Sequence, residues 1–365
     1  MYLPAIAPFF VVGVGAGRFY SRWTIADPRR LLLKPLLGAG VVFALFLCLS
    51  YLAVRQIRVW SDSIGFWTYV IEGDTEHAPV TYLFRGQSYM AAGDFNKAIG
   101  DFDRALLLNP SYDRAFDARG IAFAKAGRLE MALEDLNRAI ALNPSSADFR
   151  ISRAEVLGRM GRTGPAIEDY SAALVHDPKS AGAYLGRGIL YQELGNADGA
   201  MQDYSKAIGL DGYSADAYIR RGMVYKEVGR FGQAIEDYTK AIGLDPSSAA
   251  AYNDRGVAFR HTGQYDRAIE NYSQAIALNP RFPLAYCNRA IAYNETGRVS
   301  EAIRDYTSTL SLNPDLMKAR LDRGELYLRA GQPDLAAADF RYACGEGSEE
   351  GCRLLRGLNE RQGGR

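Results

Sequence analysis

The chain has 365 residues, enough for more than one unit of organisation. Its 43 lysines and arginines almost balance its 42 aspartates and glutamates, so no basic field argues for a nucleic-acid partner. The three histidines, His77, His176 and His261, are scattered without the spacing of metal ligands. The sequence therefore predicts no metal site, no cofactor and no small-molecule substrate.

The first 56 residues are predicted to form a membrane anchor. Residues 1–17 carry no charge but are interrupted by prolines and glycines, so they are the shorter candidate for a membrane span. Residues 36–54 form an uncharged run rich in Leu, Val and Phe. Because about 20 apolar residues cross the core of a bilayer, this second run has the length of a transmembrane helix.

The basic residues around these runs predict the orientation. Short basic loops stay on the cytoplasmic side, and the loop between the two runs has five basic residues against Asp27. The second run should therefore lead the rest of the chain to the extracytoplasmic side, periplasmic or lumenal. A signal peptide is the alternative, but no short apolar core with a small-residue cleavage site stands near the terminus. The basic residues are Arg18, Arg22, Arg29, Arg30 and Lys34.

Residues 57–78 are predicted to be a linker with a capping helix. An amphipathic helix over 61–73 would use apolar residues such as Ile64, Trp67 and Ile71. We expect it to cover the first of the repeats that follow, whose outer face would otherwise be exposed.

From Pro79 to Glu350, one pattern of 34 residues is written eight times without insertion or deletion. Glycine or alanine recurs at position 8, an aromatic or large apolar residue at position 11, alanine at position 20, and proline at position 32 of most repeats. Proline lacks an amide hydrogen and ends a helix there. The predicted repeats are 79–112, 113–146, 147–180, 181–214, 215–248, 249–282, 283–316 and 317–350, followed by a C-terminal capping helix and tail at 351–365.

This pattern resembles the tetratricopeptide repeat (TPR), in which small residues at positions 8 and 20 let two helices cross closely. A single helix pair cannot bury its apolar face, so pairs stack into a solenoid with a concave inner surface. The resemblance implies an all-α protein: a right-handed α-solenoid of eight helix pairs, preceded by one or two transmembrane helices.

Arginine occupies position 7 of every repeat, and aspartate occupies position 23 of seven, with Asn271 in the sixth. We predict a ladder of ion pairs between the two helices of each repeat; an anion-binding stripe is the alternative. Partial burial and bidentate geometry would make such pairs stronger than exposed ones. The predicted ladder consists of Arg85, Arg119, Arg153, Arg187, Arg221, Arg255, Arg289 and Arg323 with Asp101, Asp135, Asp169, Asp203, Asp237, Asp305 and Asp339.

The resemblance also implies a partner groove, because positions 2, 5, 9, 12 and 13 line the concave surface of TPR proteins. An apolar seam with mixed charges beside it suits an extended or helical peptide. TPR proteins that bind chaperone tails carry Lys at position 5 and Asn at position 9, and no consecutive repeats here show that set. The predicted groove comprises Leu83, Gln87, Ile121, Lys125, Leu185, Ile189, Gln192, Ile219, Met223, Lys226, Asn253, Val257, Arg260, Ile291, Asn294, Leu321 and Glu325.

Cys344 and Cys352 stand eight residues apart in and after the last repeat. Their spacing resembles that of cysteine-rich relatives of the TPR, in which such cysteines cross-link the helices of a pair. The resemblance implies a disulfide in an oxidising compartment; two buried free thiols are the alternative.

Two short motifs in the N-terminal part carry a second resemblance. Tyr2-Leu3-Pro4, together with Arg58, Trp60, Asp62, Ser63 and Trp67, resembles the last membrane helices of transmembrane-and-TPR O-mannosyltransferases. In that family the catalytic acidic residues lie in upstream loops, so no catalytic residue is carried over. Met1 is then either an internal start within a longer glycosyltransferase or the start of a separate relative that kept the anchor and the solenoid.

Taken together, these features favour a non-catalytic, membrane-anchored TPR scaffold that binds a protein or peptide in its groove. The first alternative is the acceptor-recruiting C-terminal part of a protein O-glycosyltransferase. The second is an assembly factor for an envelope or secretion complex.

Overall fold

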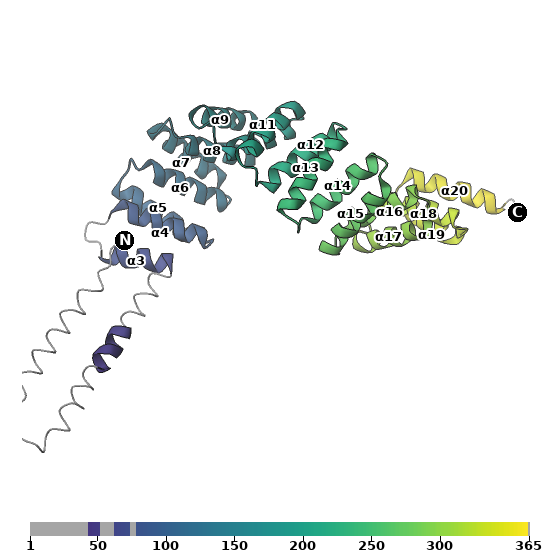
Figure 1. Ribbon diagram of the computed structural model, residues 1–365, viewed down its shortest axis with the longest axis horizontal. Helices are drawn as coiled ribbons and strands as arrows, with labels where there is room; N and C mark the ends of the chain where they lie inside the picture. Colours follow the sequence, from purple (N-terminus) through teal and green to yellow (C-terminus); the bar gives the residue numbers. More distant parts are fainter. Residues whose placement is uncertain (1–42, 52–61, 74–77, 364–365) are drawn as a thin grey trace, which may run out of the picture. The chain divides into compact units, whose positions relative to one another are not determined.

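The computed structural model describes residues 43–51, 62–73 and 78–363 of the chain. Every regular element in these ranges is helical, and the chain divides into two compact units, residues 1–109 and residues 110–365. Figure 1 shows the helices labelled in order along the chain.

Unit 1 contains a helical segment at 43–51 and three longer helices. These are α3 (Ser63–Gly73), α4 (Pro79–Ala91) and α5 (Phe95–Leu108). Helix α3 packs on α4, where the indole of Trp67 stacks on the ring of Phe84 with 4.8 Å between ring centroids. It therefore covers the first repeat, and begins two residues later than the predicted 61–73.

Unit 2 contains seven further helix pairs and a final helix. The first helices of the pairs, called A helices here, are α6 (Asp113–Lys125), α8 (Ala147–Arg159), α10 (Ala181–Glu193), α12 (Ala215–Glu227), α14 (Ala249–His261), α16 (Pro283–Glu295) and α18 (Met317–Arg329). The second helices, or B helices, are α7 (Leu129–Leu142), α9 (Thr163–His176), α11 (Ala197–Leu210), α13 (Phe231–Leu244), α15 (Tyr265–Leu278), α17 (Val299–Leu312) and α19 (Pro333–Gly345). The final helix is α20 (Glu349–Gly363).

A glycine at position 15 makes the turn between the two helices of every repeat. Gly229, for example, has φ of 76°, a left-handed conformation that glycine adopts without strain. The next amide, that of Arg230, donates back to the carbonyl of Tyr225 over 2.7 Å and so closes the end of α12. Glycines with φ between 72° and 80° stand at this position in all eight repeats, a regularity that sequence analysis overlooked.

The core of each repeat is built where its two helices cross. The alanine at position 20 is fully buried in all eight repeats. In five repeats a glycine at position 8 lies against an aromatic ring at position 24; a Cβ atom at Gly222, for example, would come within 2.9 Å of the Tyr238 ring. In these repeats the absence of a side chain at position 8 sets how closely the helices approach.

The A helices of consecutive repeats in unit 2 contact one another directly. Each of α6, α8, α10, α12 and α14 touches the A helix of the following repeat as well as its own B helix. Closer neighbours lie on the inside of a curved stack, so the A helices supply the inner face of this unit.

No helix within residues 43–51, 62–73 and 78–363 is long and apolar enough to cross a membrane. The predicted span at 1–17 lies outside the described residues, and only residues 43–51 of the predicted span at 36–54 lie inside them.

Candidate functional site

The arginines at position 7 and the aspartates at position 23 form a ladder of bidentate ion pairs. In each of seven repeats the guanidinium donates from Nε and Nη2 to the two carboxylate oxygens, over 2.7–2.9 Å. The aspartates are at most 6% exposed. Each pair therefore ties the A helix of a repeat to its B helix at a nearly buried position.

A third contact of the same arginines joins neighbouring repeats. The Nη1 atom of Arg221 donates to the hydroxyl of Ser205, at position 25 of the preceding repeat, over 2.9 Å. Sequence analysis missed this position, although it carries Ser, Thr or Asn in most repeats. Its other members in unit 2 are Asn137, Ser171, Thr239, Ser273 and Thr307.

The ladder extends to α3 in unit 1, where Arg85 Nη1 donates to the Thr68 hydroxyl over 3.4 Å. Thr68 thus takes the place of a position-25 side chain, and α3 behaves as the B helix of a preceding repeat. This contact adds to the capping of α4 by Trp67.

In repeats 2, 4, 5 and 7 the guanidinium carbon lies 5.6–5.9 Å from the centroids of aromatic rings at both position 4 and position 11. The Arg187 guanidinium carbon lies 5.8 Å from the centroids of both Tyr184 and Tyr191. The hydrogen bond with Asp203 raises the pKa of Arg187, with burial opposing the rise. Hydrogen bonds to aspartate and these rings leave the ladder arginines engaged within the protein, which supports a structural role.

The sixth repeat breaks the ladder. Arg255 Nε donates to Asn271 Oδ1 over 2.8 Å, while the Asn271 amide nitrogen donates to the carbonyl of Arg267. Because the partner is neutral, burial lowers the pKa of Arg255, whereas the pKa of Arg221 in the fifth repeat is raised. Repeat 6 thus holds a half-buried arginine without the carboxylate present in the other seven repeats.

Most of the predicted groove residues lie on the A helices with partly or fully exposed side chains, but three are buried. Leu83 and Leu321 are only 2% and 5% exposed, and Asn253 is 7% exposed. Leu321 packs in a cluster with Phe340 and Leu358, so the C-terminal helix α20 covers it. These three residues belong to the protein interior, so their assignment to the partner groove was wrong.

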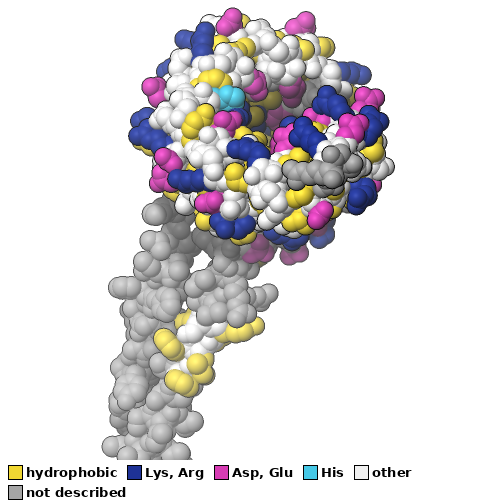
Figure 2. Space-filling model, turned by 90° about the vertical axis from the view of Figure 1, so that its right-hand side faces the viewer, with side chains coloured by type: hydrophobic (Ala, Val, Ile, Leu, Met, Phe, Trp, Pro, Cys, Tyr) yellow, Lys and Arg dark blue, Asp and Glu magenta, His cyan; other side chains and the backbone are white. Residues whose placement is uncertain are grey.

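Polar side chains connect the A helices of repeats 5 to 8. Lys226 forms a 2.9 Å ion pair with Asp254 of the next repeat. Asn288 Nδ2 donates to Asn253 Oδ1 over 2.9 Å, and Arg329 Nη1 donates to Asn294 Oδ1 over 2.6 Å. These contacts place polar side chains beside the apolar seam predicted from the sequence. Figure 2 shows basic and acidic side chains mixed around the hollow of the visible face.

Repeats 4 to 7 share a combination absent from the other four. Position 12 carries a side chain with N–H donors, and position 24 carries a tyrosine. Position 12 is Met, Ala, Gly and Leu in repeats 1, 2, 3 and 8, and position 24 is Phe or Leu in repeats 1, 2 and 8. In repeat 4 the two positions meet, because the Tyr204 hydroxyl donates to Gln192 Oε1 over 2.9 Å. The pairs are Gln192 with Tyr204, Lys226 with Tyr238, Arg260 with Tyr272, and Asn294 with Tyr306.

Arg260 and His261 stand at the end of α14. Arg260 Nη2 lies 3.2 Å from His261 Nε2, and the imidazole stacks on Phe231 with 4.6 Å between ring centroids. Burial lowers the pKa of His261, and the charges of Arg260 and Lys226 lower it further. The surroundings of this imidazole are therefore positively charged.

An acidic counterpart lies between α6 and α8. Burial raises the pKa of Asp117 to about 6, and the charges of Asp148, Glu155 and Asp113 add to this rise while a hydrogen bond with Ser152 opposes it. Asp117 Oδ1 is buried without a hydrogen-bond partner among the described residues. The A helix of repeat 2 thus carries a buried carboxyl group at its contact with repeat 3.

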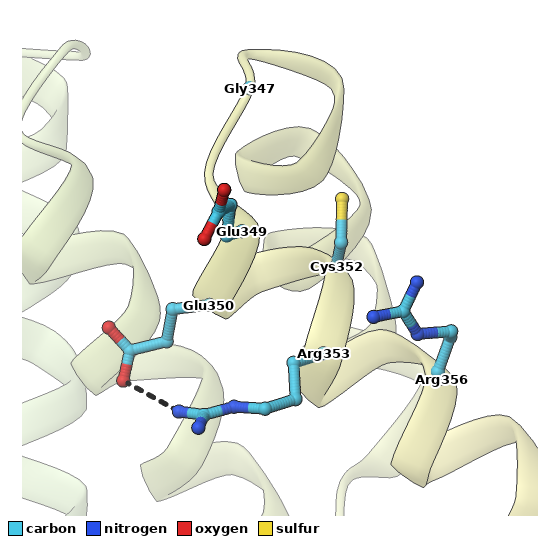
Figure 3. Close-up of a pocket in the computed structure, with 6 residues that line it drawn as sticks. All are labelled: Gly347, Glu349, Glu350, Cys352, Arg353 and Arg356. Atoms are coloured by element: carbon cyan, nitrogen blue, oxygen red, sulfur yellow. Dashed lines mark ion pairs between the residues drawn. The ribbon is translucent and has the colours of Figure 1, made fainter.

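Cys344 and Cys352 form a disulfide, with 4.5 Å between their Cα atoms. It joins α19 to α20 next to an open cavity of about 750 Å³. Figure 3 shows that the lining comes from the turn before α20 and its first two turns, with a 3.7 Å ion pair between Glu350 and Arg353. The lining residues are Gly347, Glu349, Glu350, Cys352, Arg353 and Arg356.

Neither this cavity nor the inner face has the arrangement of a metal centre. Within the part of the chain that the structure describes, no group of three or more His, Cys, Asp or Glu side chains could hold a metal ion. Cys287 is a partly buried free thiol whose pKa is raised by burial to about 11, which disfavours the reactive thiolate.

Comparison with known proteins agrees with the observed fold. A family model of the tetratricopeptide repeat matches residues 85–147, 151–215 and 287–350, more than half of the chain. Further models of the same repeat match residues 215–248, 237–270 and 256–297. No curated protein matches the chain.

Several solved structures are similar. MamA is 28% identical over 45% of this chain and 96% of its own, with a TM-score of 0.43. A tetratricopeptide repeat protein from Parabacteroides merdae is 24% identical over 68% of this chain and 99% of its own, with a TM-score of 0.51. The C-terminal part of a TPR protein from Cytophaga hutchinsonii is 17% identical over 64% of this chain and 96% of its own, with a TM-score of 0.55. The last two show the fold alone.

The helix pairs, their 34-residue register and the family match define a repeat protein of the α-solenoid class. The chain belongs to the tetratricopeptide repeat family. The TPR prediction from the sequence is thereby confirmed.

Proposed function

We propose that this chain is a membrane-anchored scaffold that binds a protein or peptide on the inner face of its repeats and catalyses no reaction itself. The observation that carries the proposal is the continuous inner face formed by the A helices of unit 2. In repeats 3 to 8 the residues at positions 9, 12 and 13 are exposed or partly exposed along it. Such a face can hold an elongated polypeptide over several repeats.

The mixture of side chains on this face supports a polypeptide partner. Apolar groups such as Ile189 and Met223 lie beside amides and ion-paired charges such as Gln192 and Lys226. A polypeptide offers apolar side chains and main-chain hydrogen bonds to such a surface, whereas a polyanion would meet as many acidic groups as basic ones.

The anchor and the orientation rest on the N-terminal sequence. In the described part of the 36–54 run, Phe43, Phe46 and Leu47 are more than half exposed to solvent. A bilayer would cover these side chains at a favourable free energy of transfer. With the basic loop at 18–34 inside the cell, the repeats would lie on the extracytoplasmic side.

Site-specific photo-crosslinking in intact cells tests the binding face. A photoreactive amino acid at Glu193 or Glu295, both exposed at position 13 of an A helix, should capture the same partner. Placed at Lys240, an exposed residue of the B helix α13, it should not capture that partner. Equal capture from all three positions would contradict binding on the inner face.

Protease accessibility tests the orientation. A tag after Arg365 should be removed by protease added outside intact cells or spheroplasts. Complete protection in intact cells, with digestion after lysis, would place the repeats on the other side of the membrane.

The resemblance to O-mannosyltransferases supports a second candidate, the acceptor-recruiting part of a protein O-glycosyltransferase. Trp67, one of the residues of that resemblance, lies in α3 and caps the first repeat. A neighbouring reading frame with many membrane spans and acidic loop motifs would favour this candidate. A partner found in an envelope or secretion complex would instead favour an assembly factor.

A further inference from the structure

Repeat 6 differs from the other repeats of the inner face in its charge balance. Arg260 has no ion pair with a carboxylate among the described residues, whereas Lys226, at the same position of repeat 5, is paired with Asp254. Repeat 6 is also the repeat in which Asn271 leaves Arg255 without a carboxylate. Departures from an otherwise strict repeat, made at a cost in stability, are typical of functional positions.

A buried tyrosine and an unused donor lie at Arg260. The Tyr272 side chain is fully buried. Burial raises the pKa of Tyr272, while the charge of Arg260 and a hydrogen bond with it oppose that rise, so the two groups are close. The Nε atom of Arg260 is buried without a hydrogen-bond partner among the described residues. A buried donor without an acceptor is costly unless a ligand or water satisfies it.

We propose that Arg260, with His261 beside it and the Tyr272 hydroxyl beneath it, forms a subsite for one carboxylate of the bound polypeptide. This inference rests on the proposed function and specifies which repeat and which partner chemistry determine binding. The subsite uses positions 12, 13 and 24, so it differs from the Lys and Asn arrangement of chaperone-tail binders considered above.

The charges around Arg260 favour a single carboxylate over a phosphate group. Lys226 is neutralised by Asp254, and Glu227 lies at the neighbouring position 13. Arg260 is therefore left without a carboxylate partner on this face, and its single positive charge matches the single negative charge of one carboxylate. A dianionic phosphate would carry a second negative charge that Arg260 does not balance, near the carboxylate of Glu227.

The test uses the purified full-length chain in detergent and short fluorescein-labelled peptides built from alanine, serine and leucine. One peptide carries a central glutamate, a second the isosteric glutamine, and both have amidated C termini. A third has no glutamate but a free C-terminal carboxylate, which separates the two sources of the group. We expect one of the two carboxylate peptides to bind roughly tenfold more tightly than the glutamine peptide, as charged hydrogen bonds allow.

Matched variants locate the effect. Arg260→Gln should abolish the preference for the carboxylate, and Arg260→Lys should retain part of it. Arg304→Gln, which removes the same charge from an exposed position of the B helix α17, should leave the preference unchanged. Thermal melting of each variant shows whether a loss of binding reflects unfolding, and the lysine variant keeps the charge if the glutamine variant unfolds.

Three results would overturn the subsite: equal affinity for all peptides, no measurable binding of any of them, or an unchanged preference in Arg260→Gln. Photo-crosslinking from Glu193 and Glu295 in the Arg260→Gln background separates this failure from that of the proposed function. If the crosslinks to the cellular partner persist while the peptides show no preference, the scaffold role stands and the carboxylate subsite is wrong. If the crosslinks from the unsubstituted chain are also absent, the proposed function itself is wrong.

Discussion

Substituting Asn271 by aspartate should restore the missing rung of the arginine ladder. Asn271 is 6% exposed and accepts one hydrogen bond from Arg255, over 2.8 Å. In the neighbouring repeat, Asp237 accepts two from Arg221, over 2.8 and 2.7 Å. The variant would therefore add a second, charge-assisted hydrogen bond and neutralise a half-buried guanidinium.

The expected gain is the balance of two contributions. A bidentate pair at this depth should exceed the 0.2–1 kcal/mol typical of exposed pairs, so about 1.5–2 kcal/mol is reasonable. Against this, the aspartate loses the 2.8 Å bond from the Asn271 amide to the Arg267 carbonyl, a cost of about 0.5–1 kcal/mol. The net increase in the free energy of unfolding should be about 1 kcal/mol, or about 2 °C in melting temperature for a chain of this size.

Urea titration and thermal melting of the full-length chain at pH 7 measure the gain. Asp237→Asn is the matched reverse substitution and should lower stability by about 1–2 kcal/mol, because it leaves Arg221 without its charge partner. The gain of Asn271→Asp should disappear in acid, below the ordinary aspartate pKa of about 3.9, where the new side chain is neutral. If Asn271→Asp does not stabilise and Asp237→Asn does not destabilise, the ladder contributes helix register but no net electrostatic stability.

Three other predictions concern packing, pH dependence and the C-terminal cap. Gly222→Ala places a Cβ atom 2.9 Å from the Tyr238 ring and should lower the free energy of unfolding by about 1–3 kcal/mol. The control Gly243→Ala has open space around it and should raise the free energy of unfolding by about 0.5–1 kcal/mol. Equal melting temperatures of the two variants would contradict the packing described. Asp117→Asn removes a carboxyl group whose folded pKa is raised to about 6, so it should stabilise by about 2 kcal/mol above pH 6. Urea titrations should show the gain shrinking as the pH falls from 6 and vanishing below the ordinary aspartate pKa of about 3.9, where wild-type Asp117 is protonated in both the folded and the unfolded state. Cys344→Ser removes the disulfide, so it should lower the free energy of unfolding by about 2 kcal/mol and make α20 accessible to protease. Protease resistance equal to that of the parent chain would mean that packing alone holds the helix.

The features that could be predicted best from the sequence are those that depend on the residues of a single repeat. The 34-residue register, the small residues at positions 8 and 20 and the aromatic rings between them are all visible within a single helix pair. The arginine at position 7 and the aspartate at position 23 could also be paired from the sequence, because their spacing is the same in each repeat. Two features were not predicted: the glycine at position 15, although all eight copies are in register, and the hydrogen-bond acceptors at position 25, whose arginine partners lie in the next repeat.

The sequence by itself therefore determined the helix pair and its repetition, since these depend on residues at most 34 positions apart in a fixed register. Only the tertiary structure decided which side chains remain available to a partner. Leu321 and Leu185 occupy the same position 5, yet Leu321 is 5% exposed because α20 covers it, while Leu185 remains partly exposed. The unpaired Arg260 likewise became apparent only when Lys226 was found beside Asp254 of the next repeat. Exposure and charge balance depend on which neighbour each side chain meets, and the local pattern of a repeat does not record that neighbour.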